Sequence, residues 1–508
     1  MPANWTEGYV SDIPYTTNYF GELAPSNMQV ALLERGVHAG VPLGKPFTWC
    51  ELGCGRGLTT NLLAGANPQG QFYATDFMPG HISEARALAE EGGLTNAHFY
   101  DDDFASFCER PELPQFDYIV IHGVYSWVPD ETRKAIVRFF EKKLKVGGVV
   151  VVSYNTDVGW DAVHPFQRLV RDVVPDHGMG SVERINRGMA LLDRLEALGA
   201  RGYVNNPIAV QRIRQMREND QTYVSHELLN GAWNPMSFGQ VAGELDSAKL
   251  TFVGSSRVMN NLDFMNFSPE QIAFLNEAGS VVLQETLRDM ILARAFRSDM
   301  FVRGPVAMTI QEQIAGWRAL KIYGRKMQVQ APEKVQTLAG EATLQLDIYQ
   351  PIIEALRAGP TTVGALEQKF AGKMAMNQLA QAVVVLIAIQ FAWPVVHAEP
   401  RKVKSAEALN KALTTRARMS GALSFLAAPA NGSAVHADRI MQLLLAAAKA
   451  GEKDLTRAVM ATLEAHGERA AGADGLPLPQ DEAEAQFRPK AEAFEKTQRA
   501  ELELHGAG

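Results

Sequence analysis

The chain has 508 residues and a formal net charge of −8. This length suits about two to four domains, and the acidic balance provides no global basic field, so we expect no nucleic-acid partner. The three cysteines, Cys50, Cys54 and Cys108, contain no C-x-x-C pair, which argues against a disulfide framework and a zinc site. The first residues also lack the basic and apolar regions of a signal peptide, so we expect a cytoplasmic protein with no bound metal.

The first predicted unit, residues 1–45, precedes the first strand and contains Tyr15 and Tyr19, four positions apart. On a helix, residues at this spacing share one face. The segment is therefore either a lead-in that folds over a ligand or a short helix whose two rings pack into the core.

A glycine-rich loop, Glu-Leu-Gly-Cys-Gly-Arg-Gly at 51–57, separates an apolar run at 47–50 from a helix predicted to begin at Leu58. Glycines let the backbone turn tightly and approach a ligand. The spacing differs from the G-x-G-x-x-G of dinucleotide enzymes and resembles the first motif of class I methyltransferases, which bind S-adenosylmethionine (SAM). The alternative is a tight turn without a ligand. The resemblance implies five cofactor-binding residues: Glu51, Gly53, Cys54, Gly55 and Gly57.

The next two predicted strands also end in acidic residues. The strand at 71–75 runs into Asp76 and Phe77, and nucleotide-binding α/β folds place a carboxylate for the ribose hydroxyls about 20 residues past the glycines. The strand at 97–100 runs into three aspartates and Phe104. In similar methyltransferases such an acid bonds the adenine amino group and the following amide faces a ring nitrogen, which implies Asp103 with Phe104. Asp102, one register away, and a solvated acidic turn are the alternatives.

The fourth predicted strand, 116–121, leads into His-Gly-Val-Tyr-Ser-Trp. Ligands bind at the carboxyl ends of parallel strands, so His122, Tyr125 and Trp127 are the candidate catalytic residues, shaping a channel for the methyl acceptor. His122 is also a candidate cofactor contact, and acts as a base, as an orienting group or only structurally. Trp127 is alternatively a core anchor. Many amino-methylating enzymes carry Asn-Pro-Pro-Tyr here, so the sequence argues against adenine or glutamine N-methylation.

Strands and helices alternate over residues 46–155, including a helix over 130–144 and a fifth strand at 149–153. This pattern predicts an α/β fold with a parallel sheet covered by helices on both faces. A helical insertion follows at 156–219. Two later strands, at 249–254 and 299–304, are candidates to close the sheet as antiparallel edge strands.

Residues 305–400 form a middle domain in which three helices and a strand predict a winged-helix-like unit. Its third helix is apolar and uncharged, which favours protein contact over DNA binding. The apolar run at 379–396 barely reaches the length of a membrane span, about 18 residues, and Gln381 and Gln390 interrupt it, so we expect no membrane insertion. Residues 401–508 form a helical C-terminal domain and tail.

Beyond the loop, the chain resembles bacterial class I methyltransferases that carry a methyltransferase regulatory domain, a group that includes the rickettsial outer-membrane-protein lysine methyltransferases. The resemblance implies a Rossmann-like core with seven strands, SAM as cofactor, a lead-in over the cofactor that contributes Tyr19, and a regulatory domain at 220–304. It is carried by these segments: 15–25, 51–57, 121–127, 153–155, 159–160 and 296–304.

We therefore predict a SAM-dependent methyltransferase that acts on lysine side chains of a protein. A lysine amine must lose a proton before attack, since its ordinary pKa is ~10.4, and a dry aromatic pocket lowers that pKa. The alternatives are a methyltransferase of a small metabolite or glycan and a scaffold that binds SAM without catalysis. The partners implied are a protein or small-molecule substrate and, from the helical insertion, a second copy in a homodimer.

Overall fold

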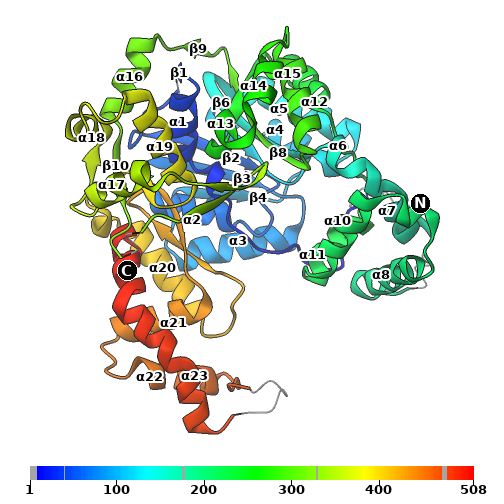
Figure 1. The fold of residues 1–508 in the computed structure, drawn as a ribbon. Coiled ribbons are helices and arrows are strands. Elements are labelled where there is room, and N and C mark those ends of the chain that lie inside the picture. The colour runs from blue at the N-terminus through cyan, green and yellow to red at the C-terminus, as the bar shows by residue number, and fades with distance from the viewer. Residues whose placement is uncertain (1–7, 39, 174–177, 328–329, 472–477) are drawn as a thin grey trace.

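The computed structural model describes residues 8–38, 40–173, 178–327, 330–471 and 478–508. Its centre is a seven-stranded sheet in the order β4-β3-β2-β5-β6-β8-β7 (Figure 1). The first five strands in this order are parallel, and β8 and β7 are antiparallel at one edge. The predicted class I methyltransferase core is thereby confirmed. The bounds are β2 Phe47–Leu52, β3 Gly70–Thr75, β4 Ala97–Tyr100, β5 Phe116–Ile121, β6 Leu144–Asn155, β7 Leu250–Ser255 and β8 Phe296–Arg303.

The central strands are buried on both faces. All six residues of β5 are buried, as expected of a parallel strand between two helical layers. The helix predicted over 130–144 is α5, Asp130–Lys143, which buries Ile136, Phe139 and Phe140 at helical spacing against one face of the sheet. The other connecting helices are α2 Leu58–Ala66, α3 Pro79–Glu91 and α4 Phe104–Cys108.

The lead-in differs from the sequence prediction. Residues 9–20 contain no helix, so Tyr15 and Tyr19 do not share a helix face. Helical structure begins only at η1, Gly21–Leu23, and α1, Pro25–Glu34, where proline suits the first helical turn.

A helical lobe follows β6 and projects to one side of the sheet (Figure 1). It has a hydrophobic cluster of its own that contains Ile185, Leu192, Ile213 and Leu228. Its last helix, α11, begins after Asp220, whose carboxylate accepts the backbone N–H groups of Thr222 and Tyr223. The main helices of the lobe are α8 Ser181–Ala197, α10 Pro207–Arg217 and α11 Gln221–Leu229.

The polypeptide then returns through α12, Phe238–Asp246, and α15, Val281–Leu292, which flank the edge strands β7 and β8. On β8 the buried Arg297 pairs with three carboxylates, Asp299, Asp289 and Glu285. Removal of one partner would leave a buried charge uncompensated. This cluster therefore fixes the edge strand and α15 in one arrangement.

A second, three-stranded sheet has the order β13-β10-β14. The apolar run at 379–396 divides between the helix α19 and the strand β14, and the helix is packed inside this unit with Leu379 to Ile387 largely buried. Within the described ranges, the chain has no helix long and apolar enough to cross a bilayer. The bounds are β10 Lys321–Gly324, β13 Thr361–Thr362, β14 Ala392–Pro394, α17 Leu346–Leu356, α18 Val363–Lys369 and α19 Met376–Ala388.

The C-terminal domain packs on the methyltransferase core through its first helix and a hairpin, while its later helices α22 and α23 extend away from the core (Figure 1). Ser405 donates a hydrogen bond to the carbonyl of Gly65 on α2, and Asn67, just after α2, donates one to the carbonyl of Gly432. The hairpin formed by β15 and β16 contacts α2 as well. The bounds are α20 Lys404–Arg416, β15 Phe425–Ala428, β16 Ser433–His436, α21 Arg439–Lys449, α22 Leu455–Ala465, α23 Gln480–Ala493 and α24 Arg499–His505.

Candidate active site

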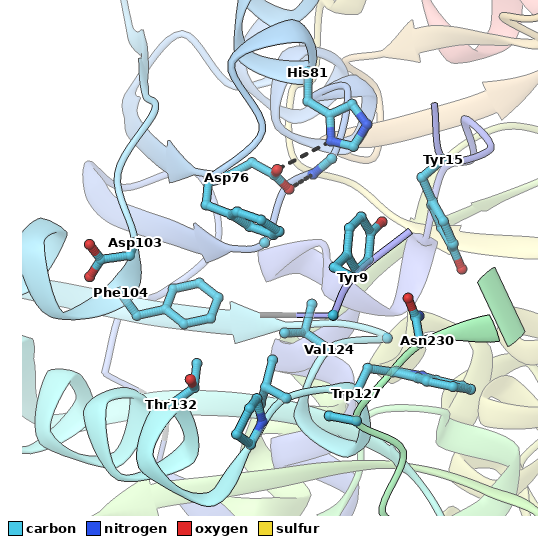
Figure 2. A pocket seen from close by; sticks show the side chains of 18 of the residues that line it. Tyr9, Tyr15, Asp76, His81, Asp103, Phe104, Val124, Trp127, Thr132 and Asn230 are labelled. Atoms are coloured by element: carbon cyan, nitrogen blue, oxygen red, sulfur yellow. Dashed lines mark hydrogen bonds and ion pairs between the residues drawn. The ribbon is translucent and has the colours of Figure 1, made fainter. Parts of the chain in front are cut away.

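A cavity of about 560 Å³ lies at the carboxyl edge of the parallel strands. Residues that follow β2, β3, β4 and β5 form one side of it. The lead-in and α11 form the opposite side, with Tyr9, Tyr15 and Asn230 facing Asp76 and Phe104 across the space (Figure 2). This is the edge at which open α/β sheets bind ligands.

The glycine loop after β2 contributes Gly53 and Gly55 to the cavity wall, but not Gly57. Gly57 precedes α2 in a left-handed conformation, where a Cβ would lie 2.4 Å from that of Ala85. Its role is therefore the close approach of α2 to α3. A Cβ on Gly55 would meet no atom within 4 Å, so the backbone here leaves a cradle open toward the cavity.

The two polar residues predicted in this loop lie beneath it rather than in the cavity wall. The Glu51 carboxylate accepts the Thr60 hydroxyl, and burial raises the pKa of Glu51 to about 8. The Cys54 thiol donates to the carbonyl of Gly55. Neither lines the cavity, so we assign both to support of the loop.

Asp76 lies at the end of β3 and holds the loop from the side. Its Oδ2 accepts the N–H of Gly55 at 2.9 Å, and its Oδ1 accepts the N–H of Met78 at 3.0 Å. His81 Nδ1 lies 3.2 Å from the same Oδ1. The other ring nitrogen of His81, Nε2, is buried with no hydrogen-bond partner in the described part of the chain. Phe77 lines the cavity beside them, with the Tyr9 ring 5.5 Å away.

The aspartates that follow β4 already have hydrogen-bond or ion-pair partners within the protein. Asp103 caps α4, and its Oδ1 accepts the N–H groups of Ala105 and Ser106. Asp102 pairs with Arg110. Both aspartates line the cavity, but in Figure 2 the Phe104 ring points into it while the Asp103 carboxylate points away. Contact between Asp103 and adenine remains a prediction. It requires the Asp103 carboxylate to bond the adenine amino group while it still caps α4.

His122 and Trp127, which follow β5, both line the cavity. The His122 ring lies against that of Phe20, with centroids 3.8 Å apart, and burial lowers the pKa of His122 to about 4. The imidazole is therefore neutral at neutral pH, and its Nδ1 is buried without a partner among the described residues. Trp127 stacks on Trp233, with centroids 5.5 Å apart.

Two predicted site residues are not brought to the cavity. Tyr125 is fully buried, and its hydroxyl donates to Glu244 of α12 at 2.5 Å. Tyr19 bonds Ser433 of the C-terminal hairpin through its hydroxyl. Neither residue lines the cavity, so the structure places Tyr125 away from the position of the acceptor and Tyr19 away from that of the cofactor. Both hydroxyls are used to attach the core to later parts of the chain.

Sequence reasoning missed most of the wall opposite the sheet. The rings of Tyr9 and Tyr15 lie 5.2 and 4.9 Å from that of His226, and Glu227 and Asn230 lie beside it. None of these residues belongs to a spaced motif, because α11 is about 170 residues downstream of the loop that it faces. Only for Tyr15, in the aromatic lead-in, did the sequence offer a signal.

The cavity fits SAM by two observations. The loop leaves open space at Gly55 where any side chain would intrude, and two buried ring nitrogens, His81 Nε2 and His122 Nδ1, have no partner in the described chain. Buried polar atoms are nearly always hydrogen-bonded, so a polar ligand is the expected partner.

Comparisons with known proteins agree with this geometry. A family model for a methyltransferase domain matches residues 50–150, and one for a predicted methyltransferase regulatory domain matches residues 220–303. The uncharacterised protein sll1526 of Synechocystis sp. is 38% identical over 474 residues, which cover 92% of each chain. This chain belongs to the class I SAM-dependent methyltransferases that carry a methyltransferase regulatory domain. It is thus an enzyme whose cofactor is SAM.

Two further proteins are similar to this chain over different lengths. PKMT2 from Rickettsia typhi, solved in complex with S-adenosylhomocysteine (AdoHcy), has the same fold with a TM-score of 0.67 at 16% identity, over 95% of this chain and 98% of its own. A trans-aconitate 2-methyltransferase of Methylobacterium nodulans is 30% identical over 135 residues, 27% of this chain and 47% of that enzyme. The fold of this chain is therefore shared with PKMT2 over almost its whole length, not only in the methyltransferase core.

Proposed function

We propose that this methyltransferase transfers methyl groups from SAM to side-chain amines of lysine residues in proteins. The observation that carries the proposal is the charge of the cavity, because no lysine or arginine of the described chain lines it. An acidic wall attracts a cationic amine and repels an anionic metabolite. Six acidic residues line the cavity, of which Asp103 turns its carboxylate away: Asp76, Asp101, Asp102, Asp103, Glu131 and Glu227.

The aromatic wall supports the same acceptor. Tyr9, Tyr15 and Trp127 line the cavity, and a lysine side chain combines an apolar stem with a cationic head, both of which aromatic faces accommodate. These rings also exclude water. A dry site lowers the pKa of a bound amine from ~10.4 and so favours the neutral, nucleophilic form.

The relatives support a protein acceptor over a small metabolite. Similarity to PKMT2 extends over 95% of this chain, whereas similarity to the trans-aconitate methyltransferase extends over 27% of it. The lobe and the C-terminal domains therefore have counterparts in PKMT2. A large protein substrate would give these additional domains a surface to bind.

The residues of the cavity would have separate roles in the reaction. When bound, SAM supplies an electrophilic methyl group. Asp76 and His81 would hold the ribose, since a carboxylate at this position in α/β folds binds its hydroxyls. Phe77 and Phe104 would hold the base, and Trp127 would align the acceptor. Alignment and exclusion of water are the main contributions that a protein makes to a displacement of this kind.

A label-transfer experiment tests the proposal. The purified chain is incubated with bacterial lysate and SAM carrying a tritiated methyl group, proteins are separated on a gel, and labelled bands are digested for mass spectrometry. We expect label on lysine, and weaker label with the Asp76→Ala variant at limiting SAM. Label confined to small molecules would support the metabolite or glycan alternative, and no transfer at all would support a SAM-binding scaffold.

Further predictions concern partners and location. We expect no binding to duplex DNA, because the cavity and the chain are acidic; a steeply salt-dependent mobility shift would contradict this. Light scattering would test the predicted homodimer. The cytoplasmic location remains a prediction for cell fractionation.

A further inference from the structure

One carboxyl group of the cavity differs from the other five. Glu227 projects from α11 and is only 7% exposed. Asp76 and Asp103 accept backbone N–H groups, and Asp101, Asp102 and Glu131 pair with arginine or lysine side chains. Glu227 forms no ion pair within the described residues, and only the nearby Tyr223 hydroxyl favours its carboxylate. Among the acidic residues of the cavity, Glu227 is thus the one whose carboxylate has no cationic side chain or backbone N–H group as a partner in the described chain.

The surroundings of Glu227 contain no compensating charge. Tyr15 faces it from the lead-in, and Tyr223 faces it from its own helix. The neighbouring His226 is neutral, because burial lowers its pKa to about 4. No charged side chain of α8 or α10, which pack on α11, forms an ion pair with Glu227 within the described residues. A buried carboxylate without a cation is unfavourable, and a cationic ligand would remove that cost.

We propose that Glu227 binds the protonated amine of the acceptor and removes one proton from it before methyl transfer. This inference rests on the proposed function and names the group that recognises the amine. In the step, an N–H bond of the ammonium breaks and an O–H bond forms on the Glu227 carboxylate. The products are a neutral amine, with its lone pair available, and a neutral carboxylic acid.

The ionisation of Glu227 supports this assignment. Burial raises its pKa to about 7, and the Tyr223 hydroxyl opposes that rise. A carboxyl group poised near neutrality can both bind an ammonium and accept its proton, as general base catalysis requires. The tyrosines around it have pKa values raised by burial and stay neutral. Affinity for a cation should therefore increase with pH through about pH 7, as Glu227 ionises.

The binding test uses the full chain with AdoHcy and n-butylammonium as the probe, because this cation has the stem and head of a lysine side chain. Saturation-transfer difference NMR measures its affinity between pH 6 and pH 8, and n-butanol is the neutral comparison. We expect Glu227→Gln to lose at least ~10-fold in affinity for n-butylammonium, about 1.4 kcal/mol, and to lose its pH dependence. Binding of n-butanol and AdoHcy should not change.

Glu218→Gln is the matched control. Glu218 directly follows α10 in the same lobe, is exposed and does not line the cavity, so this variant should bind n-butylammonium as the wild type does. Tyr223→Phe is a second probe, which should move the pH midpoint of binding upward because it removes the hydroxyl group that lowers the pKa of Glu227. It also serves if Glu227→Gln does not fold.

Unchanged n-butylammonium binding in folded Glu227→Gln, or an unmoved pH midpoint in Tyr223→Phe, would overturn the inference. The proposed function can fail separately. If n-butylammonium binding depends on Glu227 but label enters only small amines, the protein acceptor is wrong and the role of Glu227 stands. If Glu227→Gln methylates protein lysine at the wild-type rate, the function stands and the inference is wrong.

Discussion

The glycines of the SAM loop should respond differently to the same added methyl group. Gly57 and Gly55 both have left-handed backbones, with φ of +70° and +52°, which cost an alanine about 1–2 kcal/mol. At Gly57 the new Cβ would also lie 2.4 Å from that of Ala85 and 2.9 Å from the Phe99 ring, and overpacking adds about 1–3 kcal/mol. Gly57→Ala should therefore lose about 2–5 kcal/mol of stability, the sum of the two costs.

Gly55→Ala should lose only the backbone part, about 1–2 kcal/mol, because no atom lies within 4 Å of its Cβ. Its methyl group would instead occupy the cradle, and SAM affinity should decrease at least ~10-fold, about 1.4 kcal/mol. Gly93→Ala is the matched control. Its φ is +61° and its Cβ also meets no atom within 4 Å, but it does not line the cavity, so SAM affinity should not change.

Two measurements separate these effects. Thermal unfolding without ligand ranks stability, with Gly57→Ala expected lowest and the other two variants close together. Calorimetric titration with SAM then measures affinity in the folded variants. Wild-type SAM affinity in Gly55→Ala would exclude the cradle as part of the site. Equal stability of Gly57→Ala and Gly93→Ala would contradict the packing argument.

Three further predictions follow from the site. Asp76→Ala should weaken SAM binding by at least ~1 kcal/mol, since hydrogen bonds to a charged group contribute about that or more; unchanged calorimetric affinity would remove Asp76 from the site. Tyr125→Phe should lower thermal stability by ~1 kcal/mol, through loss of its bond to Glu244, with normal turnover; a 10-fold loss of turnover at unchanged stability would restore Tyr125 as a catalytic group. Glu51 has a folded pKa raised to about 8 by burial, so its contribution to stability is present below its unfolded pKa of about 4.5 and is lost as pH rises toward 8. Glu51→Gln should therefore melt higher than the wild type at pH 8, with the difference shrinking toward pH 5; a constant difference would refute the assignment.

The methyltransferase core could be read from the sequence because its signals are local. Five strands, from Phe47 to Asn155, appear as largely apolar runs, and glycine or aspartate directly follows the first three. A parallel strand buried on both faces must be apolar along its length. The positions of Gly55 and Asp76 follow from the same rule, since ligands bind where such strands end. These elements lie where the pattern predicted.

Residue roles within that core were harder to predict. Tyr125 and Trp127 are two positions apart in one segment, yet only Trp127 lines the cavity. A short 3₁₀ turn at 125–127 separates their directions, and α12 supplies Glu244 for the Tyr125 hydroxyl. The sequence gives the composition of such a turn but not the direction in which each side chain points.

By itself, the sequence determined the cofactor, the sheet and the edge at which SAM binds, because each depends on residues close together in the chain. Only the tertiary structure decided which residues form the cavity wall opposite the sheet. Glu227 faces the loop at Gly55 because the lobe folds α11 and the lead-in over the sheet edge. Contacts between segments this far apart leave no periodic or spaced signal, and they arise only when separate hydrophobic clusters pack together.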